Sequence, residues 1–533
     1  MPDTPARTSY DEMPYPSYPM GQTHPDHLAV VATLLGMTPA PIERCRVLEL
    51  GCAAGGNLIP LALNHPQSQF IGVDLSIEQI QQGQKLVAAL GLTNIALRHA
   101  SILDVDDSYG AFDYITSHGV YSWVPAKVQE KMLAICAALL APQGVGYISY
   151  NTYPGWHMRG MIRDMMYYHV SRFPPESPAS RVARARSLLS FLVRSVPEEN
   201  TPYSLLLREQ LNLLQQHSDA YLFHEHLEEY NGPIYFREFC DQLSAHGLRY
   251  LGESEFRVMV ASTSFPAAVQ QELDDLAPHL IEREQYMDFL RNRSFRQTLF
   301  CHQNVKPRYE IRGEQLTAFH IASPARPVEN NRDLTPEVEV EFRGSGSATL
   351  TSGTPIVKAM LQCLGEAWPQ FVAFEELRIQ ARTRAGGPAP TDPELAAQDR
   401  LTMSKSLLTA YATADKSLVE LAIRPPVFTT AVSERPLAYQ LARLQTADGY
   451  QVTNLRHETC NLSHFDREIL PLLDGTRDRA ALLTAVLDKF HAGVLKIEQD
   501  DKPVTDDERA TPILNDVLAQ ELPRLARSAL LVG

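Results

Sequence analysis

The chain has 533 residues, too many for a single hydrophobic core, so we expect about three or four domains. With 44% hydrophobic and 21% charged residues, its composition is that of a globular protein and excludes a disordered or fibrous one. The formal net charge of -15 argues against non-specific binding to nucleic acid or acidic membranes, and no stretch has the roughly 18 apolar residues of a membrane helix.

The N-terminal sequence and the cysteines indicate a cytoplasmic protein. Residues 1–20 have neither the layout of a signal peptide nor a lipidation motif. The seven cysteines, an odd number without a close pair, predict neither a disulfide framework nor a metal site.

Strands and helices are expected to alternate in the first part of the chain. Residues 1–22 are predicted to form an extended arm, and a helix is predicted to begin near Thr23. Alternation of short apolar strands with helices predicts a parallel sheet with helices on both faces. The expected strands are 46–50, 70–74, 95–98, 112–116 and 145–150, and the expected helices are 58–64, 76–90 and 126–140.

Helices dominate the pattern after residue 155, before a polar, proline-containing segment at 322–335 that is expected to be a linker. A hairpin follows, with RGSGS as its turn. The other expected elements are long helices at 203–231 and 278–293, a strand at 251–260, helices from Pro355, and helices at 466–473, 478–490 and 512–531, the last with Thr511 as its N-cap.

The segment VLELGCAAGGN at residues 47–57 lies where the first strand meets the next helix. Its glycines allow a tight turn and close approach of a ligand to free N–H groups at the helix start. It is not a P-loop, because no Gly-Lys-Ser/Thr follows, and it is not GxGxxG, because Gly51 and Gly55 are four residues apart. The alanine at position 53, in place of a glycine, is expected to have a negative φ.

Two acidic residues accompany this loop. Glu49 lies two residues before Gly51, and Asp74 ends the second strand. An acidic residue about 20 residues beyond a glycine loop is placed to accept hydrogen bonds from ribose hydroxyls. The alternative for Asp74 is a carboxylate that stabilises the N-terminus of the following helix.

These motifs resemble those of class I S-adenosylmethionine-dependent methyltransferases. Glu49–Asn57 is similar to motif I of that family, and Phe112–Pro125 is similar to motif IV, at the edge of the acceptor pocket. The resemblance extends to bacterial methyltransferases with a regulatory domain, a group that includes protein lysine methyltransferases of outer-membrane proteins. The segments that carry this part are Tyr15–Ala29, His118–Pro125, Ser149–Arg159, His224–Glu253 and Phe465–Leu483, the last similar to a winged-helix-like module.

The resemblance implies an α/β fold in several domains. We expect a doubly wound Rossmann-like methyltransferase sheet, then a mainly helical regulatory domain, an α+β domain and a winged-helix-like C-terminal domain. The expected boundaries are 1–22 for the arm, 23–155 for the methyltransferase domain, 156–321 for the regulatory domain, 336–445 for the α+β domain and 446–533 for the C-terminal domain.

The implied cofactor is S-adenosylmethionine, held by residues that follow the strands. Ser101 stands where the family often has an acidic residue for the adenine amino group, so Asp104 is the alternative for that contact. The implied cofactor-binding residues are Glu49, Gly51, Cys52, Ala53, Gly55, Asn57, Asp74, Leu75, Ser101, Ile102 and His118.

An acceptor lysine must be desolvated or deprotonated, because its amine has a pKa of about 10.4 in water. An aromatic pocket suits this, since rings attract the cation and exclude water. The candidate catalytic residues follow the fourth and fifth strands: His118, Tyr121, Trp123, Tyr153 and Trp156. For each aromatic residue the alternative is core or lid packing, and His118 is a base, a cofactor contact or a structural histidine.

The implied function is lysine methylation of a protein substrate, and a homodimer is left open. Two alternatives remain: a small metabolite or another protein atom as acceptor, and a non-catalytic cofactor-binding regulatory or scaffold protein. Methylation of DNA bases is not expected, because Ser117–Val120 replaces the Asn/Asp-Pro-Pro-Tyr motif. The HEHLEE segment at 224–229 is predicted to be a solvated helix face and not a metal site, because histidines two apart point to different faces.

Overall fold

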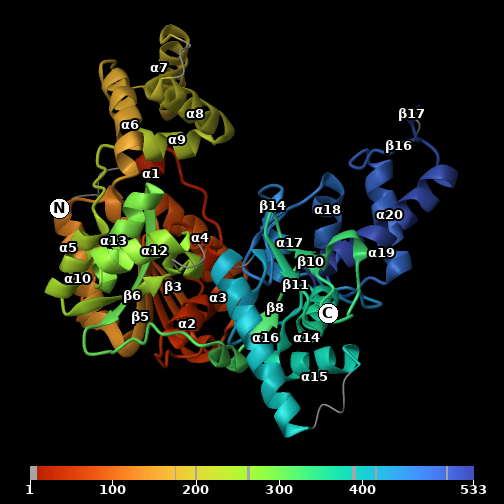
Figure 1. The fold of residues 1–533 in the computed structure, drawn as a ribbon. Helices are drawn as coiled ribbons and strands as arrows, with labels where there is room; N and C mark the ends of the chain where they lie inside the picture. Colours follow the sequence, from red (N-terminus) through yellow and green to blue (C-terminus); the bar gives the residue numbers. More distant parts are fainter. Residues whose placement is uncertain are drawn as a thin grey trace. The chain divides into compact units, whose positions relative to one another are not determined.

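The computed structural model describes residues 9–174, 176–197, 201–260, 265–386, 392–414, 417–499 and 502–532. The chain divides into two compact units (Figure 1). The first unit contains Met1–Ser17 and Val31–Pro307, and the second contains Tyr18–Val30 and Arg308–Gly533. None of the helices in the described part of the chain is both long and apolar enough to cross a membrane.

A seven-stranded sheet lies at the centre of the first unit, with the strand order β3-β2-β1-β4-β5-β7-β6. Strands β1 to β5 are parallel, and β7 runs antiparallel between β5 and β6. The strand order reverses between β1 and β4, and ligands bind at the carboxyl ends of strands at such a point. The strands are β1 Arg46–Leu50, β2 Gln69–Asp74, β3 Ile95–His99, β4 Phe112–Ser117, β5 Leu140–Asn151, β6 Leu248–Glu253 and β7 Phe295–His302.

The helices that pack on this sheet bury its apolar strands. Helices α3 and α4 contact β2 and β3, and α5 and α10 share a core with β1, β4, β5 and β7. Met132 and Phe239 lie in that core with Ile148. These helices are α3 Leu58–Asn64, α4 Ile77–Ala89, α5 Ala126–Leu139 and α10 Phe236–Ala245. The first unit also contains α12 Ala267–Leu276 and α13 Leu280–Arg291, and α2 spans Pro25–Leu34. The doubly wound sheet expected for residues 46–150 is confirmed.

The sheet continues beyond residue 155, where the α/β domain was expected to end. The strand expected at 251–260 is wrong in its bounds, because β6 ends at Glu253 and a short 3-10 helix follows at Phe256–Met259. Strand β7 was not predicted. Its second residue, Arg296, is charged yet fully buried, which interrupts the apolar pattern by which strands are recognised.

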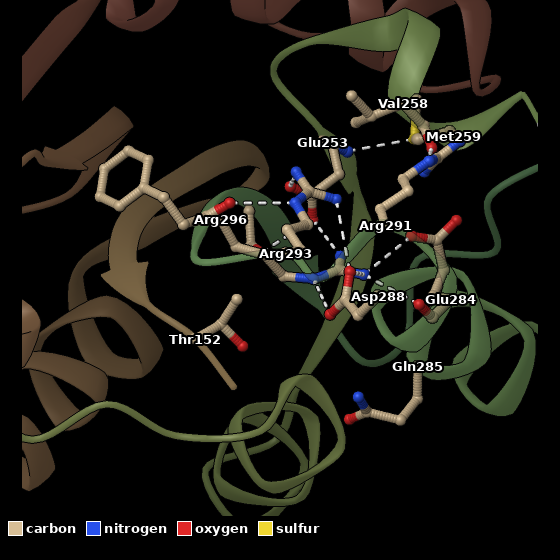
Figure 2. A network of polar contacts seen from close by, with 12 residues as sticks. Thr152, Glu253, Val258, Met259, Glu284, Gln285, Asp288, Arg291, Arg293 and Arg296 are labelled. Carbon is tan, nitrogen blue, oxygen red and sulfur yellow. Dashed lines mark hydrogen bonds and ion pairs between the residues drawn. The ribbon is translucent and has the colours of Figure 1, made fainter. Parts of the chain in front are cut away.

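Arg296 is buried because carboxylates surround it (Figure 2). Its Nη1 lies 2.6 Å from Oε1 of Glu253 at the end of β6, and its Nε lies 2.8 Å from Oδ2 of Asp288 on α13. Its Nη2 lies 3.1 Å from Oε2 of Glu284, also on α13. Burial would raise the pKa of Glu253, but Arg296 and Arg293 outweigh this effect and hold it below its ordinary value. The network therefore joins the last two strands to α13 through buried ionised groups.

Four further helices of the first unit form a lobe with its own core: α6 Trp156–Ser171, α7 Pro178–Ser195, α8 Pro202–Gln216 and α9 Asp219–His226. Ile162, Leu189, Leu207 and Leu222 meet in this core. The single helix expected at 203–231 is two helices, because the side chain of Ser218 caps a new helix by accepting a hydrogen bond from the backbone of Tyr221.

The second unit combines helices with small sheets. The hairpin expected around RGSGS is confirmed as β10 Val340–Arg343 paired with β11 Thr349–Ser352. The linker expected at 322–335 is wrong, because the segment contains the end of β8 and all of β9, and Ser323 and Ala325 are buried. The other elements before residue 420 are β8 His320–Ala322, β9 Arg326–Pro327, β12 Val372–Ala373, α14 Pro355–Ala367, α15 Phe374–Arg384 and α16 Pro393–Ala414.

The C-terminal part of the second unit contains small hairpins and helices. Its last helix begins at Asp507 and not at Pro512, because the side chain of Asp506 caps it by accepting from the backbone of Arg509. The elements are β13 Glu420–Ala422, α17 Gln440–Gln445, β14 Gln451–Thr453, β15 Thr459–Asn461, α18 His464–Ile469, α19 Arg479–His491, β16 Glu498–Gln499, β17 Lys502–Pro503 and α20 Asp507–Arg527.

Candidate functional site

The loop between β1 and α3 is held close to its neighbours by glycines. Gly51 and Gly55 have φ values of 81° and 75°, which favour glycine. A Cβ atom on Gly51 would lie 2.3 Å from Cγ2 of Val120, and one on Gly55 would lie 2.9 Å from Cδ1 of Leu97. The loop therefore needs glycine at both positions for its conformation and for its packing.

Ala53, in the same loop, has a φ of 49°, so the expectation of a negative angle is wrong. This left-handed conformation costs an alanine roughly 1 kcal/mol. The Ala53 N–H donates to Oδ2 of Asp74 at 2.8 Å, and this charge-assisted bond offsets the cost.

Glu49 lies at the end of β1 and is buried beneath the loop, with 1% of its surface exposed. The side-chain amide of Asn57 donates to its Oε1 at 2.9 Å, while its Oε2 has no hydrogen-bond partner among the described residues. Burial raises the pKa of Glu49 to about 7, against the lowering effect of Asn57. Such an oxygen fits a donor group that a ligand brings into the site.

Asp74 ends β2, beside the loop. Its two oxygens accept backbone N–H groups of Ala53 and Ser76, each at 2.8 Å. Burial nevertheless raises its pKa above the ordinary value. A carboxylate has about four acceptor positions, so Asp74 retains capacity for ribose hydroxyls while it fixes the loop.

The other predicted cofactor residues differ in exposure. Cys52 is buried, and Leu75 is 48% exposed. The hydroxyl of Ser101 accepts from the backbone of Leu103 at 3.2 Å, and Ile102 packs against the sheet core. Ser101 thus caps the short turn after β3 with its own side chain.

His118 follows β4, and its Nδ1 lies 2.8 Å from the hydroxyl of Tyr147 on β5. Burial lowers the pKa of His118 to about 4, so the ring is neutral near pH 7. A group with so low a pKa is a poor acceptor for the proton of an ammonium group.

The four predicted aromatic residues occupy different surroundings. Tyr121 is fully buried, donates its hydroxyl to Oε1 of Gln242 at 2.5 Å, and packs edge-on against Phe239, so the structure places it in the core. Trp123, which ends a short 3-10 helix after β4, and Trp156, the first residue of α6, meet edge to face with ring centroids 6.2 Å apart. The structure therefore brings the two tryptophans into contact, and their role in an acceptor pocket stays a prediction.

Tyr153 lies among rings and acidic groups after β5. It stacks on His157 with centroids 4.1 Å apart and lies 5.2 Å from the ring of Tyr235. Burial raises the pKa of the Tyr153 hydroxyl, and Tyr235 and the negative charges of Glu238 and Asp164 add to that effect. The contact of Tyr235 with Tyr153 was not predicted, because it joins residues remote in sequence.

The contacts of the arm before α2 with the glycine loop and with α4 were not predicted. The hydroxyl of Ser17 accepts a hydrogen bond from the N–H of Gly56 at 2.8 Å. The hydroxyl of Ser76 donates to Oδ1 of Asp11 at 2.5 Å. A short helix, α1, occupies Ser9–Glu12 within the segment that was expected to be extended.

The expected solvated face at HEHLEE is wrong. His224 and His226 are 4% and 5% exposed. His224 contacts Glu228 and the arm, while burial and nearby cations lower the pKa of His226 to about 4. Within the ranges that the structure describes, no group of three or more His, Cys, Asp or Glu side chains is placed to hold a metal ion.

Known proteins share this arrangement. Family models match a methyltransferase domain at residues 47–144, a predicted methyltransferase regulatory domain at 218–302 and the PKMT C-terminal winged helix domain at 434–530. An uncharacterized protein of Rickettsia prowazekii is 36% identical and covers 98% of this chain and 93% of its own length. PKMT2 of Rickettsia typhi, solved in complex with AdoHcy, is 31% identical, with a TM-score of 0.86 over 98% of this chain and 100% of that one.

The fold, the glycine loop and these matches define a class I S-adenosylmethionine-dependent methyltransferase. The chain belongs to the family of such enzymes that carry a methyltransferase regulatory domain and a PKMT winged helix domain. Its cofactor is S-adenosylmethionine, as the resemblance implied.

Proposed function

We propose that this methyltransferase transfers methyl groups to lysine side chains of protein substrates. The observation that carries the proposal is the group of rings after β5, where the ring of Tyr153 contacts those of His157 and Tyr235. Aromatic faces attract a cationic side chain. The similarity to PKMT2 over nearly the whole chain supports the same assignment.

The residues around the glycine loop fit the cofactor. We propose that the unpartnered Oε2 of Glu49 accepts a hydrogen bond from the ammonium group in the methionine part of the cofactor. Asp74 would accept hydrogen bonds from the ribose hydroxyls. Ser101 and Ile102, after β3, would contact the adenine of the cofactor. His118 would lie beside the part of the cofactor that faces the acceptor. The bound cofactor supplies an electrophilic methyl group, so the protein has mainly to orient and desolvate the reactants.

The acceptor amine must lose its proton before it can attack. His118, with a pKa of about 4, is unsuited to remove it, and its neutral ring instead contacts Tyr147. Burial in a low-dielectric pocket lowers the pKa of a lysine amine by itself. We therefore propose that the amine gives its proton to bulk water as it enters the pocket and is desolvated. Trp123 and Trp156 would then exclude water from the neutral amine.

Trp123→Ala tests the acceptor pocket. Turnover should fall about ten- to a thousandfold, because the reacting groups lose their alignment. Cofactor affinity should stay unchanged, because the adenosine is expected after β1 to β3 and Trp123 follows β4. Trp123→Phe is the matched control and should retain most of the turnover, because it keeps a ring against Trp156.

The readout is mass spectrometry of a bacterial extract incubated with isotope-labelled S-adenosylmethionine. Labelled methyl groups on lysine, lost with Trp123→Ala, support the proposal. Label found only in small metabolites or on other protein atoms would replace lysine as the acceptor. Bound cofactor without any labelled product would favour a regulatory or scaffold protein.

A further inference from the structure

The N-terminal arm, here residues 9–17, contacts the cofactor loop at its C-terminal end. Besides the bond from Gly56 to Ser17, the carbonyl of Tyr15 accepts from the side chain of Gln79 at 3.0 Å, in the first turn of α4. A Cβ atom on Gly56 would lie 2.3 Å from the carbonyl oxygen of Ser17. The arm therefore packs directly on the loop that holds the cofactor.

The same arm contacts α9 in the helical lobe, and His224 is the centre of this contact. Its Nδ1 lies 2.7 Å from Oε1 of Glu228, and its Nε2 lies 2.7 Å from the carbonyl oxygen of Met13. The ring of Tyr10 stacks on the imidazole with centroids 4.4 Å apart and planes 8° apart. The hydroxyl of Ser9 donates to the same oxygen of Glu228 at 2.7 Å.

The two ring nitrogens of His224 hold the two sides of this contact. A carbonyl oxygen only accepts hydrogen bonds, so Nε2 of His224 donates to Met13. The contact of Nδ1 with Glu228 and the stacked ring of Tyr10 fix the orientation of the imidazole. The bond to Met13 thus depends on the orientation that Glu228 and Tyr10 give to the ring.

We propose that His224 and Glu228 are positioning residues that hold the arm closed on the cofactor loop. Helix α9 lies within the segment matched as the regulatory domain. Because α9 contacts the arm and the arm contacts the cofactor loop, the position of α9 then determines how tightly the cofactor is held. Neither residue touches the loop itself; both act through residues 9–17. Movement of α9 away from the arm would release the cofactor without any change in the glycine loop.

Glu228→Ala in the full chain tests this proposal. It removes the hydrogen bonds of the Glu228 carboxyl group with His224 and Ser9, so the ring of His224 loses a contact that orients its bond to Met13. The Kd of S-adenosylhomocysteine, measured by calorimetry, should rise about five- to fiftyfold, and its dissociation should become correspondingly faster. Glu229→Ala is the matched control, an exposed neighbour whose Kd should stay within about twofold of the wild type.

A double-mutant cycle that combines the variant at position 228 with Ser17→Ala distinguishes an effect that passes through the arm from a general loss of structure. Ser17 contacts the loop, Glu228 contacts the far end of the arm, and independent distant substitutions have multiplicative effects on Kd. If the arm connects them, the double variant should bind no more than about twofold more weakly than the weaker single variant. Multiplicative effects, or an unchanged Kd in Glu228→Ala, would overturn the proposal. If the melting temperature of Glu228→Ala is also lowered, either result would assign Glu228 a structural role only.

Discussion

At the scale of single residues, buried carboxylates determine how the cofactor site responds to pH. The pKa of Glu49 is about 7, whereas that of His118 is about 4, so of these two groups only Glu49 changes charge near neutral pH. In the ligand-free protein, the raised pKa means that the folded state holds this proton more tightly than the unfolded state. Its contribution to stability is therefore present at acidic pH and is lost as the pH rises toward 7.

Cofactor binding should have the opposite pH dependence. The ionised form of Glu49 pairs with an ammonium group, so the affinity for S-adenosylhomocysteine should rise as the pH increases from about 6 to about 7.5, by at most about tenfold per pH unit. Calorimetry at several pH values measures this. Glu49→Gln should bind more weakly and with a flat profile, and an equal slope in that variant would assign the titration to another group.

The positions of the candidate cofactor residues in the fold were predictable, because the strands and the glycine loop are local features of the sequence. Glu49 lies in β1, Gly51 and Gly55 follow it, and Asp74 ends β2, as their positions in the sequence indicate. The angle of Ala53 was not predictable, because its hydrogen-bond partner, Asp74, comes from another strand. The core position of Tyr121 depends on Phe239 and Gln242, more than a hundred residues away.

At the scale of elements, the bonds of Arg296 explain why β6, β7 and α13 form one assembly (Figure 2). The guanidinium also lies 3.7 Å from the centroid of the Phe236 ring, on α10. Local periodicity was sufficient to predict β1 to β5, whose strands are apolar. It was not sufficient for β7, because the buried ion pairs that stabilise this strand give it a polar sequence.

Arg296→Met should lower the free energy of unfolding by about 3–5 kcal/mol, because it leaves the carboxylates of Glu253, Glu284 and Asp288 buried without their shared cation. Denaturation by urea, followed by circular dichroism, measures the loss. Arg257→Met removes the half-exposed ion pair with Glu255 and should cost less than about 1 kcal/mol. Equal losses in the two variants would contradict the importance of the buried network.

At the scale of the whole molecule, the methyltransferase sheet cannot be cut at residue 155. Strand β5 pairs with β7 from Gly146 to Asn151, and Phe300 of β7 lies in the core with residues of α5. A fragment of residues 1–155 should lack cooperative thermal unfolding, because it exposes this core and an unpaired strand edge. Circular dichroism measures the transition. Binding of S-adenosylhomocysteine by that fragment would contradict the prediction.

The position of β7 in the sheet also has a consequence during synthesis on the ribosome. The cofactor loop and β5 leave the exit tunnel early, but about 140 residues separate the end of β5 from the start of β7. At bacterial translation speeds of about 5–20 residues per second, the edge of β5 waits roughly 7 to 30 seconds for its neighbour. During this interval the nascent chain presents an unpaired edge that can pair with other chains. The yield of active enzyme should therefore depend on translation speed and on chaperones that cover this edge, even where the finished protein is stable.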